Sequence, residues 1–147
     1  MRKTIRISVA VFVIAVVVAQ AVRISTVNPP VVGDIAAPAP VDAILRRACY
    51  DCHSNQTVWP WYSHIAPVSW LLANDVEEGR RELNFSTWST YDATKRAKKL
   101  TETAKEVGEG EMPPWYYVLV HSDAKLADTD RETLRAWTVE ETGKLTR

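Results

Sequence analysis

Several residue types and patterns are scarce in this sequence of 147 residues, which contains two cysteines and one methionine beyond the first residue. Lysine plus arginine and aspartate plus glutamate each total 18, so the formal charge is zero and no nucleic-acid or polyanionic partner is indicated. We find no internal repeat and no low-complexity segment. Strand-like alternation is nearly absent after residue 40. One small, all-α domain behind a short leading segment is therefore expected.

Both cysteines belong to the run Cys49-Tyr50-Asp51-Cys52-His53, which has the Cys-x-x-Cys-His spacing of a c-type haem attachment site. Two thiols can add across the vinyl groups of one porphyrin, and the adjacent imidazole can reach the iron. Positions i, i+3 and i+4 of a helix share one face, so Cys49, Cys52 and His53 can point at one flat cofactor. The run predicts a single covalent haem c with His53 bound to its iron.

Three other interpretations of the cysteine pair were weighed. A thioredoxin-like redox centre would need a βαβ context, of which there is no sign. A zinc site usually takes four ligands, and His53, His64 and His121 do not have the spacing of a zinc pattern. A structural disulfide would close a very short loop and stabilise the fold little. The haem interpretation is preferred over all three.

A second iron ligand is predicted at Met112, which lies far downstream of His53. The methionine follows the Gly-Glu-Gly segment 108–110 and precedes two prolines that stiffen the loop. Methionine opposite histidine raises the haem potential, which suits electron transfer. The alternative is that Met112 fills the core. His64 and His121 are competing sixth ligands.

The first 24 residues have the pattern of an export signal. Three basic residues precede an apolar run over residues 7–22. We predict an uncleaved anchor in residues 1–24 that spans the inner membrane once and leaves the haem domain in the periplasm. The alternative is a signal peptide that is cleaved near Ala21, within Ala19-Gln20-Ala21, and releases the domain into the periplasm.

The rest of the chain divides into a linker and a helical domain. Four prolines and a glycine make residues 25–40 an extended, semi-rigid linker, and residues 41–140 form the haem-binding domain. Four helices are predicted: residues 42–52, Pro67 to Gly79 or Leu83, residues 91–107 ending at Gly108, and one that begins with a capping box at 129–132. The fourth helix is expected to bury Leu134 and Trp137, and the basic cluster at residues 95–99 of the third is expected to be a solvated face. Five aromatic residues are expected near the haem: Trp59, Trp61, Trp115, Tyr116 and Tyr117.

Four segments together resemble a known family: Cys49–Asn55, Trp59-Pro60-Trp61-Tyr62, Ile65–Trp70 and Gly110–Tyr116. They are similar to the bacterial haem-binding domain family of cytochrome c-like proteins over about residues 41–140. The resemblance implies a monohaem c-type domain with a cytochrome c-like fold. It also implies thioether bonds at Cys49 and Cys52, His53 as proximal ligand, and Met112 as a further ligand.

The expected function is one-electron transfer at the periplasmic face of the membrane. We find no nucleophile–base pair and no carboxylate pair, which favours an electron carrier over an enzyme. A haem-based sensor that binds a small gas is one alternative. A weak peroxidase-like enzyme is another, with His64 as its acid–base group. The sequence indicates membrane contact through the N-terminal helix but gives no redox partner.

Overall fold

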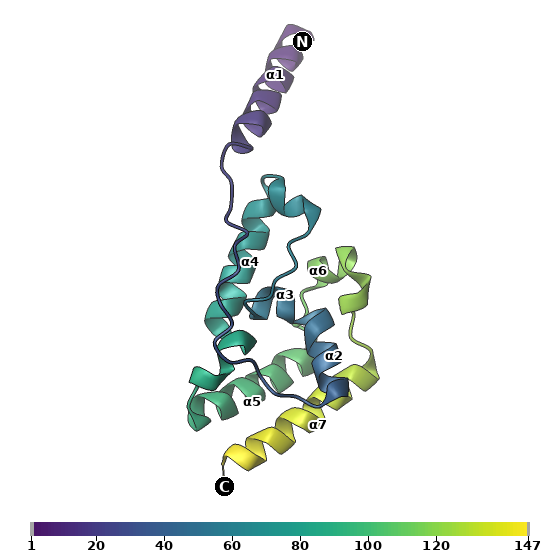
Figure 1. Ribbon diagram of the computed structural model, residues 1–147. Helices are drawn as coiled ribbons and strands as arrows, with labels where there is room; N and C mark the ends of the chain where they lie inside the picture. The colour runs from purple at the N-terminus through teal and green to yellow at the C-terminus, as the bar shows by residue number, and fades with distance from the viewer. Residues whose placement is uncertain (1, 147) are drawn as a thin grey trace.

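All the regular secondary structure in the computed structural model, which describes residues 2–146, is helical (Figure 1). Its elements are α1 (Arg2–Ala19), α2 (Ala39–Ala48), α3 (Tyr50–His53), η1 (Trp61–His64), α4 (Val68–Glu82), η2 (Phe85–Thr90), α5 (Ala93–Glu109), α6 (Trp115–Val120), η3 (Ser122–Ala124) and α7 (Asp128–Leu145), where η marks a 3₁₀ helix. There is no strand within residues 2–146, so the predicted all-α class is confirmed.

The core forms where α2, α5 and α7 meet. Helices α5 and α7 lie side by side with the most extensive contact in the molecule, and α2 packs on α7 (Figure 1). Leu45 of α2 and Leu134 of α7 are fully buried, and Leu100 of α5 is 2% exposed. The predicted burial of Leu134 and Trp137 is confirmed. Apolar positions at helical spacing therefore specify this core.

The start of α7 differs from the prediction. The capping box was expected at 129–132, but the helix begins at Asp128 and the residue before it is Ala127. The Asp130 carboxylate accepts the Ala127 N–H at 2.9 Å and pairs with Nη2 of Arg47 at 2.6 Å. Because alanine has no side-chain acceptor, only this half of a capping box is formed. The pairing also fastens the start of α7 to α2.

We expect Asp130→Asn to destabilise the domain by about 1 kcal/mol at neutral pH, since the neutral amide loses the charge that pairs with Arg47 and accepts the Ala127 N–H less strongly. The hydrogen bond from Arg47 lowers the pKa of Asp130 below its ordinary value. The stability that the ionised Asp130 contributes to the fold is thus fully present above the pKa of an unfolded aspartate, about 3.9. This stability is lost as the pH falls through the pKa of Asp130 in the folded protein. Urea unfolding at pH 7 should separate the variant from the wild type, and the difference should shrink in acid. A difference in unfolding free energy that grows in acid would contradict this explanation. Asp123→Asn is the control.

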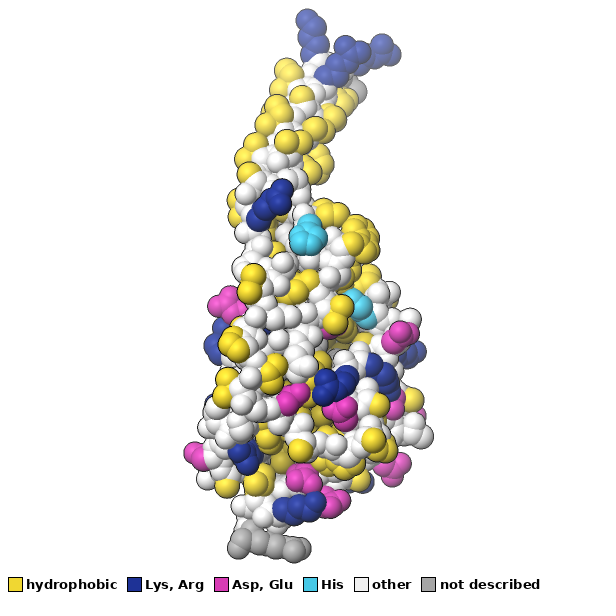
Figure 2. Space-filling model, in the orientation of Figure 1, with side chains coloured by type: hydrophobic (Ala, Val, Ile, Leu, Met, Phe, Trp, Pro, Cys, Tyr) yellow, Lys and Arg dark blue, Asp and Glu magenta, His cyan; other side chains and the backbone are white. Residues whose placement is uncertain are grey.

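Helix α1 carries exposed apolar side chains along its length and basic side chains at its start (Figure 2). Within residues 2–146, no helix is sufficiently long and apolar to cross a membrane. The predicted membrane-spanning anchor is therefore not supported. Three cations occupy the first turns of α1, and the apolar part from Ile7 to Ala19 is about 20 Å long, against a hydrocarbon core of about 30 Å.

The proline-rich segment before α2 is extended but bonded to the domain. The N–H groups of Val32 and Gly33 donate to the Ser86 carbonyl at 2.9 and 3.0 Å, and Ile35 donates to Phe85 at 3.1 Å. The Ile35 side chain is buried in the core. Residues 32–35 therefore act as a strap across η2.

Candidate functional site

The two cysteines lie where the chain turns from α2 into α3. The predicted helix over 42–52 is divided, because the backbone of Cys49 departs from helical geometry at φ −127° and ψ −34°. The N–H groups of Cys52 and His53 still donate to the Cys49 carbonyl, at 3.2 and 2.9 Å, so one turn holds the three residues together. Both cysteines are free thiols and half-buried. Burial raises the pKa of each to about 12, so both are protonated at neutral pH.

The imidazole of His53 is fixed by two backbone carbonyls. Its Nδ1 lies 2.9 Å from the Gly79 oxygen and 3.1 Å from the Leu83 oxygen. Because carbonyl oxygens only accept, Nδ1 carries the hydrogen and Nε2 keeps its lone pair. Burial lowers the pKa of His53, which favours the neutral ring. Histidines that bind metals commonly have their second nitrogen held in this way.

Gly79 brings α4 against α3. A Cβ atom built on this glycine would lie 2.6 Å from the Cys52 carbonyl oxygen, which is closer than side chains tolerate. The residue lies inside α4 and not at its end, and the helix continues to Glu82. The helix end was predicted near Gly79 or Leu83, and the second position is confirmed, since Leu83 directly follows the helix. A glycine inside a helix costs about 1 kcal/mol, so this position was a sequence signal for close packing.

We expect Gly79→Ala to destabilise the domain by about 2–4 kcal/mol and to loosen the His53 ring. The added methyl must push α4 away from α3, and the displaced Gly79 carbonyl loses its hydrogen bond to His53. Thermal unfolding measures the first effect, and the histidine ring resonances in NMR measure the second. Gly143→Ala in α7 is the matched control, because its added Cβ meets no atom within 4 Å. Equal behaviour of the two variants would show that the contact is not tight.

The motif faces two adjoining hollows, which we call the Cys-His cavity. One has a volume of about 450 Å³ and the other about 250 Å³, and both are lined by Cys49, His53, Val107 and Met112. Cys52 lines the smaller hollow and Phe85 the larger one. Cofactor sites typically measure about 300–1,000 Å³. The cavity therefore has the size and the largely apolar lining that a porphyrin requires.

Met112 lies at the wall of this cavity, in the loop that follows the end of α5. The helix was predicted to stop at Gly108, but it continues to Glu109 and is capped by Gly110, whose φ of 80° is the left-handed region that suits glycine. The N–H groups of Glu111 and Met112 donate to the Glu106 carbonyl at 3.0 and 3.2 Å. The methionine is half-buried against the core. Its loop is thus fastened to the helix terminus on one side of the cavity.

Charged side chains border the larger hollow. Lys99 lines it, its side chain is 13% exposed, and its Nζ lies 2.7 Å from Glu102 and 3.6 Å from Glu82. The cluster that includes Lys99 was predicted to be a solvated face, and for this lysine the prediction is wrong. Its position on the inner side of α5 places a cation where the carboxylates of a porphyrin can pair with it.

The remaining candidate ligands lie outside the Cys-His cavity. His64 is exposed, and His121 is bonded to Tyr62 at 3.0 Å and stacked on Tyr117. Neither histidine lines either hollow. Among residues 2–146 no group of three or more His, Cys, Asp or Glu side chains could hold a metal ion, so the zinc alternative finds no ligand set.

The aromatic residues expected near the haem divide into two groups. Tyr116 and Tyr117 line the smaller hollow, as predicted. Trp61 and Trp115 are 76% and 74% exposed, and Trp59 donates its indole N–H to Asn28; none of these three lines the cavity. Surface tryptophans cannot be distinguished from pocket tryptophans by residue type alone.

One comparison with known proteins identifies a family. A family model described as a haem-binding domain matches residues 9–140, which include the strap, the motif and the Met112 loop. No curated protein and no solved structure is significantly similar to the chain. Since the match covers most of the sequence, the chain belongs to the haem-binding domain family, and it binds haem.

Proposed function

We propose that this protein is a monohaem c-type cytochrome that transfers one electron at a time through a haem held by His53 and Met112. The observation that carries the proposal is that Cys49 and His53 of the motif border one cavity of suitable size together with Met112, which is distant in the sequence. A thioether bond from each cysteine attaches the porphyrin. The cytochrome c-like architecture is part of the same proposal.

The residues present fit such a group. The Nδ1–H of His53 is bonded to carbonyls, which leaves Nε2 to bind iron in a fixed orientation. Met112 offers a thioether from a loop that is bonded to α5. Bound haem supplies an iron that alternates between two oxidation states. The chain keeps both ligands in place and shields the iron from water, so that little rearrangement accompanies each transfer.

Two observations favour electron transfer over the alternatives. A sensor or a peroxidase needs an open iron position, whereas two candidate ligands border this cavity. A peroxidase also needs an acid–base group beside the iron, and His64, the residue considered for that role, is exposed and outside the cavity. The tethered Met112 loop is therefore the feature that supports an electron carrier.

Export of the domain is part of the proposal. The basic start and apolar body of α1 match an export signal, and its exposed apolar side chains provide contact with the membrane. The haem domain then lies in the periplasm, where c-type haem is attached in bacteria. Protease treatment of spheroplasts should digest the domain. Protection of the domain until the cells are lysed would contradict export.

Absorption spectroscopy of the full chain, produced with a c-type maturation system, tests the haem proposal. A c-type haemochrome in alkaline pyridine, one haem per chain, and a methionine–iron charge-transfer band in the oxidised form are expected. A high-spin spectrum with rapid carbon monoxide binding would instead favour the sensor. Absence of covalent haem would overturn the c-type assignment.

A further inference from the structure

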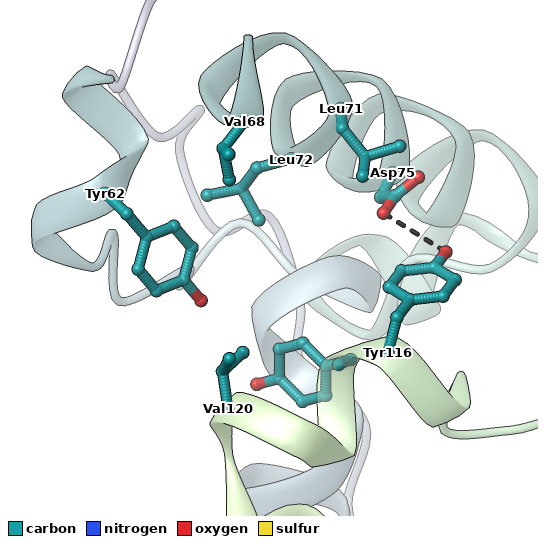
Figure 3. Close-up of a pocket in the computed structure, with 8 residues that line it drawn as sticks. Tyr62, Val68, Leu71, Leu72, Asp75, Tyr116 and Val120 are labelled. Atoms are coloured by element: carbon teal, nitrogen blue, oxygen red, sulfur yellow. Dashed lines mark hydrogen bonds between the residues drawn. The ribbon is translucent and has the colours of Figure 1, made fainter. Parts of the chain in front are cut away.

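A second pocket lies beside the Cys-His cavity. This tyrosine pocket has a volume of about 220 Å³ and is lined by Tyr62, Val68, Leu71, Leu72, Asp75, Tyr116, Tyr117 and Val120 (Figure 3). Leu72, Asp75, Tyr116 and Tyr117 also line the smaller hollow of the Cys-His cavity. A ligand in the tyrosine pocket would thus be one layer of side chains from the haem. The volume suits a single ring, since sites for larger ligands exceed about 300 Å³.

Polar groups face each other across this largely apolar pocket. Asp75 and Tyr116 lie on one side, where the Tyr116 hydroxyl donates to Asp75 Oδ2 at 3.2 Å, and Tyr62 lies on the other side (Figure 3). Burial raises the pKa of Asp75, so its carboxylate is a stronger proton acceptor than an exposed aspartate. A ring with an oxygen at each end would meet a polar partner at both.

The Tyr62 hydroxyl is oriented by His121. Nδ1 of His121 lies 3.2 Å from the Tyr117 carbonyl oxygen and must carry the hydrogen, so Nε2 accepts. The Tyr62 hydroxyl lies 3.0 Å from that Nε2 and donates to it. The lone pairs of the Tyr62 oxygen are then free to accept a hydrogen from a ligand. Tyr62 and His121 together form a short proton path that leads out of the pocket.

The mouth of the pocket is apolar and lies near the end of α1. Val68, Leu71 and Val120 are 47%, 54% and 66% exposed. The Gln20 side chain exchanges two hydrogen bonds with the Ala66 backbone, at 3.0 and 3.1 Å. These bonds join the end of α1 to the segment that leads into α4. Under the proposed function α1 contacts the membrane, and a ligand that enters an apolar mouth beside this helix would be lipid-soluble.

We propose that the tyrosine pocket binds a lipid-soluble hydroquinone, with one ring hydroxyl on Asp75 and the other on Tyr62, and that this ring reduces the haem. The inference rests on the proposed function. One hydroquinone and two ferric domains give one quinone, two ferrous domains and two protons. One O–H proton goes to the Asp75 carboxylate. The other goes to the Tyr62 oxygen as the Tyr62 proton passes to His121 Nε2.

Reduction of the ferric full-chain holoprotein by trimethylbenzohydroquinone tests the proposal. We expect two haems reduced per hydroquinone. Asp75→Asn removes the anionic acceptor and Tyr62→Phe removes the hydroxyl, and each should slow reduction about fivefold to tenfold. Each should also weaken binding of the hydroquinone to the ferrous holoprotein, which cannot oxidise it, by a similar factor measured by calorimetry. Asp123→Asn is the matched control and should behave as the wild type.

Equal rates and affinities for the two pocket variants and the control would overturn the proposal, as would no hydroquinone binding to the ferrous wild type. Dithionite reduction of each variant shows whether its haem site is intact. A protein that dithionite reduces to a normal low-spin c-type spectrum but the hydroquinone does not reduce would keep the proposed function and reject this pocket. A protein without that spectrum would reject the proposed function itself.

Discussion

The double variant Cys49→Ser/Cys52→Ser is expected to lose covalent haem and most of its cooperative folding. Serine cannot form the thioether, so acidified acetone should extract any haem that remains, and the c-type haemochrome should disappear. Without haem, the apolar side chains that line the larger hollow, about 450 Å³ in volume, are exposed to water, and the lost burial costs on the order of a few kcal/mol. That cost is a large part of the whole stability of a small domain, about 5–15 kcal/mol.

Thermal unfolding followed by circular dichroism measures this effect, and the single variants provide the controls. Cys49→Ser and Cys52→Ser each keep one thiol, and therefore one attachment point, so both should retain haem and a cooperative transition. A double variant that unfolds cooperatively at the wild-type temperature would contradict the dependence of the fold on its cofactor. If each single variant loses as much haem as the double variant, one thioether bond is insufficient to retain the haem.

The motif and the helix class were predictable because each depends on local spacing. Cys49, Cys52 and His53 belong to one turn, and the burial of Leu134 and Trp137 follows from helical periodicity. The orientation of the His53 ring was not predictable, because its partners are backbone carbonyls contributed by the far end of α4. Contacts between segments distant in sequence leave no local pattern.

Helix ends and pocket walls were the weaker part of the prediction. Gly108 and Gly110 are both plausible stops, and only the positive φ of Gly110 decides between them. The inward position of Lys99 depends on how α5 packs on its neighbours, whereas its sequence context is that of a charged surface. The position of Asp75 in a pocket wall was not predicted, because an aspartate on an amphipathic helix is ordinarily solvated.

Met112→Ala is expected to remove the methionine–iron charge-transfer band, lower the haem potential and allow carbon monoxide to bind the ferrous form. Without the thioether the sixth position is open or taken by water, which stabilises the ferric state relative to a methionine-bound iron. Alanine also leaves a small void where Met112 packs against the core, so some loss of stability accompanies the spectral change.

Comparison of Met112→Leu with Met112→Ala separates ligation from core filling. Leucine nearly preserves the volume of methionine and should cost less than about 1.5 kcal/mol, but it offers no sulfur. If Met112 binds the iron, the leucine variant loses the charge-transfer band and the high potential while remaining stable. If Met112 only fills space beside the core, the leucine variant keeps the wild-type spectrum, and only alanine lowers the unfolding temperature. The half-buried position of Met112 at the wall shared by both hollows favours the first result.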